Sequence, residues 1–350
     1  MRHCGLDVHT KRTTVVWMDD DTGEISRAST MPNDELVAYL QFLPELKQVV
    51  MEAGSTSAFL KRQFDTCQIP AIVVDAHKAS RLLEAINSQA KTDKVDAKGL
   101  AILSARGWAE PIAVWVADPP TQRLRTLTRS REQLSKVSNI LRNGIRAMLR
   151  AEGLLCSATD LTGPTARAWL DDIEARLDPL TRQMLHQNRE LIARTMENIA
   201  VIDVLLAQIA ADDERCRQLD TIAGCGVVTA AAVVAEIGDI TRFRSAKALR
   251  RYAGLTPKIE QSGERTVIGK LVRHCNKHLR RALIIIAQSF VKSARVTDTR
   301  AKSCYFRCLF RHGPNPAKVD LARRLCDIIF AMLRDGTDFD PGRLAPAKAR

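Results

Sequence analysis

Two long segments of this 350-residue chain carry apolar residues at strict seven-residue spacing. The repeating residues are Leu127, Leu134, Leu141 and Met148 in residues 121–151, and Leu185, Ile192, Ile199 and Leu206 in residues 179–212. This spacing places each set along one side of an α-helix. We therefore expect two long helices, joined by a polar segment, that pair as a helical hairpin or coiled coil. Two ordinary core helices of a bundle would give the same pattern, and they remain the alternative.

The chain before these helices alternates strand and helix signals. Short β-branched or buried-strand runs occur near residues 5–9, 13–18, 24–30, 48–52 and 71–74, and helical patterns cover 54–66 and 92–106. Such an order favours an α/β domain with a mixed sheet and helices on its faces. Pro119-Pro120 marks its end. We predict an α/β domain at 1–118, a helical hairpin at 119–215, a mainly helical domain at 216–340 and a disordered basic tail at 341–350.

Charge is unevenly distributed along the chain. The net charge is +13, but residues 241–350 alone carry +17 and residues 1–240 carry −4. A basic C-terminal third indicates a polyanionic partner such as nucleic acid, although a solvated basic surface is the alternative. There is no apolar run long enough to span a membrane, no signal-peptide pattern and no CxxC pair among the nine cysteines. These features predict a cytoplasmic protein with reduced thiols and no membrane partner.

Four acids stand where carboxylates can meet. Asp7 lies inside an apolar strand run, Glu52 ends another strand, and Asp93 and Asp96 are three residues apart on one helix face. A carboxylate within a strand is disfavoured unless it has a partner or a metal. Oxygen ligands of this kind hold Mg²⁺, or Mn²⁺ as a substitute, with room for phosphate oxygens. Taken singly, each acid can equally be a helix cap or a surface charge.

The basic third contains two further candidate features. Gly224 and Gly226 form a G-x-G turn between apolar segments, typical of a helix-hairpin-helix element whose backbone N–H groups contact phosphate; a plain helix connection is the alternative. Ser262 lies in a polar, Gly-flanked loop followed by cationic residues that can bind nucleic acid. These are Lys270, Arg273, Lys277, Arg280 and Arg281. A serine placed there can meet a phosphodiester, but most loop serines are turn or cap residues.

Several motifs together resemble one known family. Gly5-Leu6-Asp7-Val8-His9, Met51-Glu52-Ala53-Gly54 and Lys91-Thr92-Asp93-Lys94-Val95-Asp96-Ala97 are similar to the four-acid signature of DEDD-type insertion-sequence transposases. Gly254-Leu255-Thr256-Pro257, Ser262-Gly263 and Asn276-Lys277-His278-Leu279-Arg280 resemble that family's C-terminal transposase domain. The motifs occur in the family's order over nearly the whole chain. One departure is Cys275, which stands where the family usually has a glycine.

This resemblance implies a function in detail. The N-terminal domain would be RNase H-like, as in RuvC-type junction resolvases. Asp7, Glu52, Asp93 and Asp96 would bind Mg²⁺, and Ser262 would attack the phosphodiester and form a phosphoserine link. The family also implies donor and target DNA, a noncoding bridge RNA, and a homodimer or homotetramer that shares its active sites. Two alternatives remain: a junction-resolving nuclease that uses water, and a nucleic-acid-binding protein without catalysis.

Overall fold

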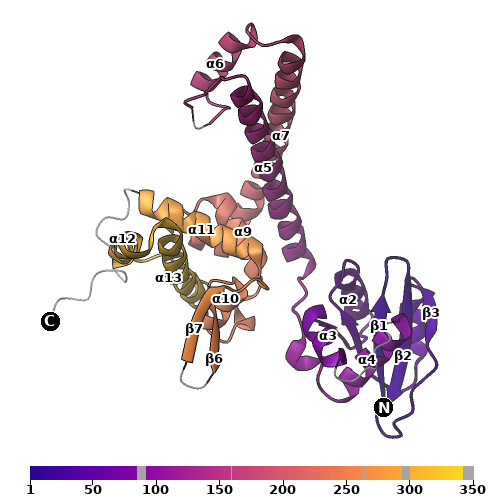
Figure 1. Ribbon diagram of the computed structural model, residues 1–350. Helices are drawn as coiled ribbons and strands as arrows, with labels where there is room; N and C mark the ends of the chain where they lie inside the picture. The colour runs from indigo at the N-terminus through magenta and orange to yellow at the C-terminus, as the bar shows by residue number, and fades with distance from the viewer. Residues whose placement is uncertain (85–91, 159, 263–264, 294–299, 342–350) are drawn as a thin grey trace, which may run out of the picture. The chain divides into compact units, whose positions relative to one another are not determined.

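The computed structural model describes residues 1–84, 92–158, 160–262, 265–293 and 300–341. It divides into two compact units, Met1–Pro119 and Pro120–Arg350 (Figure 1). The unit boundary falls at the Pro-Pro pair. The finer division at residue 215 stays a prediction, and most of the predicted tail lies outside the described residues.

The N-terminal unit is built on one mixed sheet. Its strands are β1 (Arg2–Val8), β2 (Arg12–Asp19), β3 (Ser29–Pro32), β4 (Leu46–Glu52) and β5 (Ala71–Val74). The strand order is β3-β2-β1-β4-β5. β1, β2 and β3 pair antiparallel, whereas β4 is parallel to both β1 and β5. This is the mixed sheet with helices that the sequence predicts.

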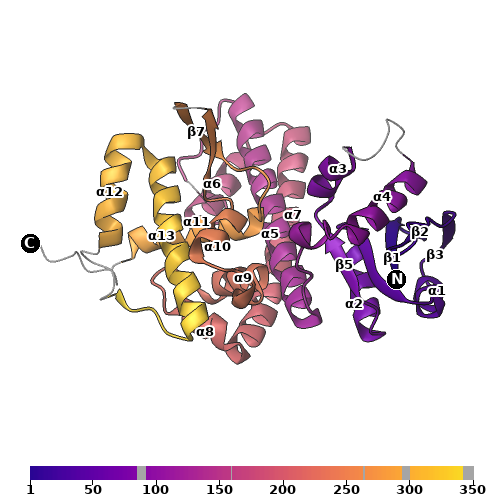
Figure 2. The same ribbon diagram turned by 90° about the horizontal axis from the view of Figure 1, so that it is seen from below.

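Helices cover both faces of this sheet (Figure 2). They are α1 (Leu36–Phe42), α2 (Ser57–Thr66), α3 (Ala76–Glu84) and α4 (Asp93–Ala105). Leu6 and Met51 face α1 and α2 in one apolar cluster, whereas Val50 and Val74 face α3 and α4 in another. The strands are therefore buried on both sides, which explains their nearly continuous apolar runs.

α4 crosses β1 at Gly5. A Cβ at this position would overlap the carbonyl oxygen of Ala97 and the backbone nitrogen of Ala101. On the same face of β1, His3 Nδ1 lies 2.8 Å from the hydroxyl of Ser104, which is also on α4. Gly5 thus permits the close approach that holds α4 against the strand carrying Asp7.

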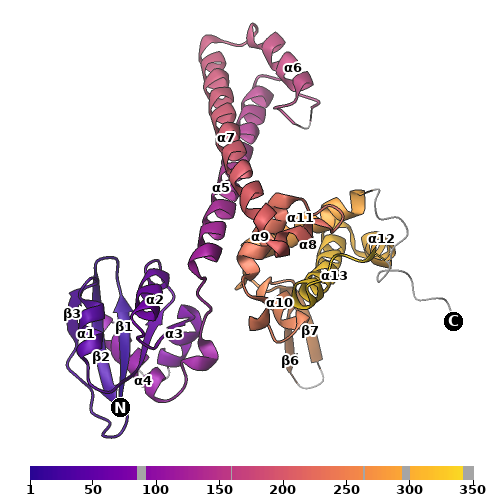
Figure 3. The ribbon, with the colours of Figure 1, turned by 180° about the vertical axis from the view of Figure 1, so that it is seen from behind.

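Two long helices open the second unit. α5 (Pro119–Ala151) and α7 (Pro179–Asp212) run side by side, and α6 (Pro164–Glu174) lies near one end of the pair (Figure 3). The predicted seam on α7 is buried, from Leu185 to Leu206. On α5, the predicted seam is only partly buried, because the face that includes Leu124, Ile145 and Leu149 packs instead. The two helices form the expected hairpin, with the α5 packing face displaced from the expected seam.

The remainder of the unit is mainly helical, as predicted. Its elements are α8 (Glu214–Asp220), α9 (Val227–Ile237), α10 (Ala246–Tyr252), β6 (Pro257–Ser262), β7 (Arg265–Leu271), α11 (Lys277–Lys292), α12 (Arg300–His312) and α13 (Pro314–Asp335). A core cluster from α8, α9, α11 and α13 fills its centre. No helix in the described part of the chain is long and apolar enough to cross a membrane.

The stretch around Ser262 differs from the expectation. The sequence predicts a polar loop, but β6 and β7 form an antiparallel hairpin in which Ser262 pairs with Arg265. Thr266, Val267 and Ile268 supply the β-branched residues that favour a strand. Of the polar residues that suggested a loop, Gln261 and Ser262 belong to β6, and Gly263 and Glu264 lie outside the described residues.

Candidate active site and nucleic-acid interface

Asp7 lies at the carboxyl end of β1. Side chains alternate along a strand, so Asp7 projects from the same face as Gly5, the face that α4 covers. Its side chain is 23% exposed, which leaves the carboxylate accessible at the edge of the buried region.

α4 brings the helical acids to this place. Thr92 caps its N-terminus by accepting a 3.4 Å hydrogen bond from the backbone nitrogen of Val95. Asp93 and Asp96 occupy the first turn, where the helix dipole favours negative charge. The cap fixes where the helix begins, and the contact at Gly5 fixes where that first turn lies relative to β1.

His9 joins two of the acids. Its Nε2 atom is 3.3 Å from a carboxylate oxygen of Asp7 and 3.3 Å from one of Asp93. One potential ligand atom from each of these three residues lies within 4.8 Å of the other two. The sequence prediction missed His9, although its position two residues after Asp7 places both side chains on one face of the chain.

Burial and the neighbouring charges in this cluster shift the pKa of Asp7. Burial raises the pKa of the Asp7 carboxyl, and the negative charges of Asp93 and Asp96 raise it further, whereas His9 lowers it. The net shift is upward, so ionised Asp7 is destabilised in the metal-free protein. A cation bound here would relieve that repulsion.

Glu52 reaches the same edge by strand register. Gly5 lies beside Val50 and Leu6 beside Met51 in the parallel pair, so the next residues are Asp7 and Glu52. Val50 belongs to the α4 face, and Glu52, two residues later, projects to that face as well. All four predicted acids therefore come from elements that meet at one edge of the sheet, with Asp7 and Asp93 in the closest group.

This donor set fits a divalent metal. Carboxylate oxygens are the ligands that Mg²⁺ and Mn²⁺ prefer, and imidazole nitrogen suits the softer ion of the two. The acids come from a rigid sheet and a capped helix, which suits a preformed site.

Ser262 is placed by its backbone alone. It is the last residue of β6 and pairs with Arg265 of β7. The side chains of residues 259–268, and the whole of Gly263 and Glu264, lie outside what the structure describes.

The two glycines of the G-x-G turn differ. Gly224 has φ +85°, and a Cβ there would overlap the backbone of Ser289 and Phe290 on α11. Gly226 is the N-cap of α9 and has open space around its Cβ position. Gly224 therefore holds the turn against α11, whereas Gly226 leaves the start of α9 approachable.

The predicted cationic residues also divide into two groups. Lys270, Arg273 and Lys277 are exposed. Arg280 is instead partly buried, and its hydrogen bonds are used within the protein. Its guanidinium donates to the carbonyls of Ala253, Gly254 and Val272, and contacts the sulfur of Cys275. We assign Arg280 a structural role. Cys275 itself does not adopt a left-handed backbone conformation, so it needs no glycine-like flexibility.

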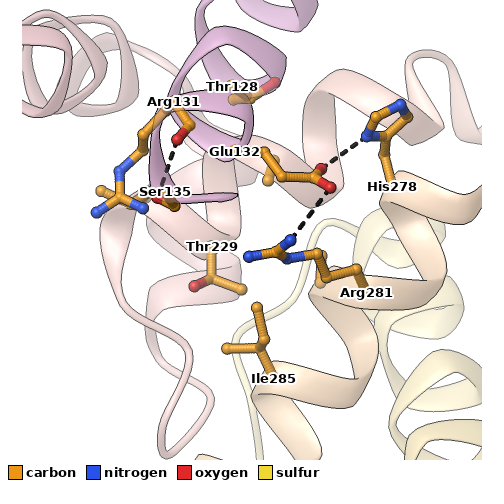
Figure 4. Close-up of a pocket in the computed structure, with 11 residues that line it drawn as sticks. Thr128, Arg131, Glu132, Ser135, Thr229, His278, Arg281 and Ile285 are labelled. Carbon is orange, nitrogen blue, oxygen red and sulfur yellow. Dashed lines mark hydrogen bonds and ion pairs between the residues drawn. The ribbon is translucent and has the colours of Figure 1, made fainter. Parts of the chain in front are cut away.

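Arg281 lines a pocket between α5, α9 and α11 (Figure 4). Glu132 of α5 accepts from Arg281 Nη1 at 3.3 Å, lies 2.7 Å from His278 Nδ1 and pairs with Lys136 at 2.6 Å. Burial tends to raise the pKa of Glu132, but the hydrogen bonds from His278 and Lys136 outweigh it and lower the pKa. Arg281 is thus partly neutralised.

A buried carboxylate that the sequence prediction missed ties these helices together. Glu236 on α9 is 1% exposed and accepts two hydrogen bonds from Arg129, at 2.7 and 2.8 Å, and one from Asn276 at 2.7 Å. Burial tends to raise the pKa of Glu236, but Arg129 and Asn276 lower it overall. Asn276 also caps α11, so one network connects α5, α9 and α11.

Comparison with known proteins decides which family this arrangement belongs to. Residues 4–152 match a family described as transposase, the DEDD type of IS110 elements, and residues 216–303 match the transposase IS116/IS110/IS902 family. The chain belongs to the DEDD-type insertion-sequence transposases. The first match contains all four acids, and the second contains the G-x-G turn, Ser262 and the basic residues that follow.

Similar transposases cover most of the chain. The transposase for insertion sequence element IS1111A of Coxiella burnetii is 27% identical over 81% of this chain and 77% of its own length. A probable family 20 transposase of Pseudomonas aeruginosa is 29% identical over 72% of this chain and 75% of its own. The pilin gene-inverting protein of Moraxella bovis is 29% identical over 73% of this chain and 70% of its own.

Membership of this family indicates an activity for the protein. This protein is a DNA transposase, and membership of a DEDD-type family suggests a divalent metal. In this transposase, two of the four signature acids already lie together beside His9.

Proposed function

We propose that this transposase exchanges DNA strands at the acidic edge of the N-terminal sheet. The observation that carries the proposal is the group formed by Asp7, His9 and Asp93, with Glu52 beside Asp7 in register and Asp96 on the same helix turn. Asp7, Glu52, Asp93 and Asp96 would hold Mg²⁺, or Mn²⁺ in its place. When bound, the ion supplies positive charge that stabilises the phosphodiester oxygens during transfer. The mixed sheet with acids at its edge also supports an RNase H-like, RuvC-like assignment.

Ser262 is proposed as the nucleophile. Its hydroxyl oxygen would form a bond to phosphorus as one phosphorus–oxygen bond of the DNA breaks, and the hydroxyl proton would end on the departing deoxyribose oxygen. The phosphate stays on the serine, so a second hydroxyl can reverse the exchange and rejoin DNA without an external energy source. A relative named for inverting a pilin gene supports chemistry that rejoins strands. The position of Ser262 next to a hairpin turn supports access to DNA.

A bridge RNA and a homo-oligomer complete the proposal, and both rest on the family resemblance. The net charge of +17 in residues 241–350 supports binding of two nucleic acids. A second, exposed apolar face on α7 supports a homodimer or homotetramer, because Met184, Leu191 and Leu205 recur there at multiples of seven residues.

The decisive experiment looks for protein covalently joined to DNA. The protein, with its element's end DNA, the candidate RNA and Mg²⁺, is resolved on a denaturing gel. We expect an adduct in the wild type, none in Ser262→Ala or Asp7→Asn, and partial activity in Ser262→Cys because a thiolate is a competent nucleophile. Ser80→Ala, an exposed serine on α3, is the matched control and should behave as wild type.

Other results would assign another function. If Ser262→Ala still cleaves DNA and releases free ends, water is the nucleophile and the protein acts as a junction-type nuclease. If the wild type binds DNA but neither cleaves nor joins it under these conditions, the recombinase proposal is wrong.

A further inference from the structure

α12 presents an unusual outer face. Five of its exposed residues recur at helical spacing on one side: Ser303, Phe306, Arg307, Phe310 and Arg311. The opposite side packs against α13, and Figure 2 places α12 at the periphery of its unit. Two phenyl rings and two guanidinium groups therefore point away from the unit that α12 belongs to.

The exposure of the rings calls for a partner. Phe310 is 94% exposed and Phe306 is 53% exposed. A single exposed apolar residue is common, but two aromatic rings one helical turn apart form a contiguous surface that favours a binding role. The ring of Phe306 lies edge to face with the ring of Tyr305, with centroids 5.4 Å apart, so the aromatic surface continues toward Tyr305.

The charges select the kind of partner. α12 contains no Asp or Glu, and among the described residues neither Arg307 nor Arg311 has an ion-pair partner. A second copy of the chain packed here across a two-fold axis would bring like charges together. Flat apolar rings interleaved with free guanidinium groups instead match unpaired nucleotides, in which bases alternate with phosphates.

We propose that the face of α12 formed by Phe306, Arg307, Phe310 and Arg311 binds unpaired DNA. Bases stack on the two rings, and the guanidinium groups contact the adjoining phosphates. Strand exchange requires a strand to leave its duplex, and this surface gives that strand a place to bind. The inference rests on the DNA transposase activity and does not depend on Ser262 or on the acids.

The test is a binding measurement with the full chain in EDTA, where metal-dependent chemistry is absent. Fluorescence anisotropy compares an oligothymidine of about 20 nucleotides, longer than the ~4–16 that one such surface covers, with a duplex of equal length. Phe310→Ala should weaken oligothymidine binding by about 5-fold or more, because one base loses the ring on which it stacks. The same variant should change duplex binding less than about 2-fold. Because Phe310 is almost fully exposed, this variant should fold as the wild type does.

Two further variants sharpen the result. Arg307→Ala with Arg311→Ala should flatten the logarithmic dependence of oligothymidine affinity on salt by about 0.7 for each phosphate that the protein no longer neutralises. Phe42→Ala removes a similarly exposed ring (86%) from α1 in the other unit and should leave binding unchanged. Equal losses of affinity for Phe42→Ala and Phe310→Ala would overturn the proposal.

Three other outcomes would also overturn it. Phe310→Ala with unchanged oligothymidine binding would exclude base stacking. If Phe310→Ala converts an oligomer to a smaller species in sedimentation and leaves DNA binding intact, the face binds a second copy of the chain. A preference of about 10-fold or more for oligouridine that Phe310→Ala abolishes would assign it to RNA.

Discussion

Asp7→Asn is expected to stabilise the metal-free protein while it abolishes strand transfer. Asp7 and Asp93 offer carboxylate oxygens within 4.8 Å of one another. Two unit charges at that separation repel by about 1 kcal/mol in a water-like dielectric and by about 3.5 kcal/mol at an effective dielectric constant of 20. The Asp93 side chain is 62% exposed and His9 offsets part of the repulsion, so the lower figure applies. A gain of about 1 kcal/mol raises the melting temperature of a unit of this size by about 3–5 °C.

The pH dependence of stability shows that ionised Asp7 destabilises the metal-free fold. Because the pKa of Asp7 is raised in the folded protein, its ionisation destabilises the fold as pH rises above the ordinary value of 3.8. Asp7→Asn should therefore stabilise the metal-free protein at neutral pH. The difference in stability between this variant and the wild type should shrink as the pH falls toward 3.8.

Intrinsic fluorescence during heating measures this effect in EDTA, since Trp17, Trp108 and Trp115 lie in the N-terminal unit. Added Mg²⁺ should raise the melting temperature of the wild type and have little effect on Asp7→Asn. Asp34→Asn, at an exposed acid before α1, is the matched control. A melting temperature for Asp7→Asn equal to or below that of wild type in EDTA would refute the reasoning.

Three further predictions use four variants of the scaffold, and urea unfolding measures the stability of each variant. Gly5→Ala should destabilise the protein by about 3 kcal/mol or more and abolish activity, since a Cβ overlaps α4 backbone; a stable, active variant would contradict this packing. Arg280→Ala should cost about 2–4 kcal/mol because it leaves carbonyls without a donor. Arg273→Ala should cost less than about 0.5 kcal/mol yet weaken DNA binding; the opposite ranking would reverse our assignments. Glu236→Ala should cost about 3–5 kcal/mol, because Arg129 is left without its carboxylate; a smaller effect would mean that the network is dispensable.

The sequence predicted those helices and strands whose bounds depend on neighbouring residues. α7 begins and ends where the Pro179 signal and the heptad repeat indicate, and β5 coincides with its short apolar run. Strands buried on both faces and a helix with Pro at its start are encoded by neighbouring residues.

The sequence did not reveal features that depend on partners distant along the chain. Glu236 looks like an ordinary acid near the end of an apolar helix until Arg129, 107 residues earlier, packs beside it. The α5 seam shifted because the helix also packs against the C-terminal core through Leu124, which a seven-residue repeat cannot report. The sequence around Ser262 concealed a hairpin, because its polar and glycine residues are more distinctive than the two short strands β6 and β7.

The acidic site shows why scattered acids can form one centre. One chain segment turns three alternate residues toward α4. Gly5 allows the helix to approach closely, Asp7 supplies a carboxylate, and the nitrogen of His9 lies between Asp7 and Asp93. A shift of one residue in the β1–β4 register would move Glu52 out of line with Asp7 and turn its side chain to the opposite face of the sheet. The buried clusters on both faces oppose such a shift, because it would remove Met51 from its cluster with α1 and α2 and turn a carboxylate toward that apolar cluster. Strand register, enforced by the apolar core, therefore assembles these acids, and their spacing in the sequence does not.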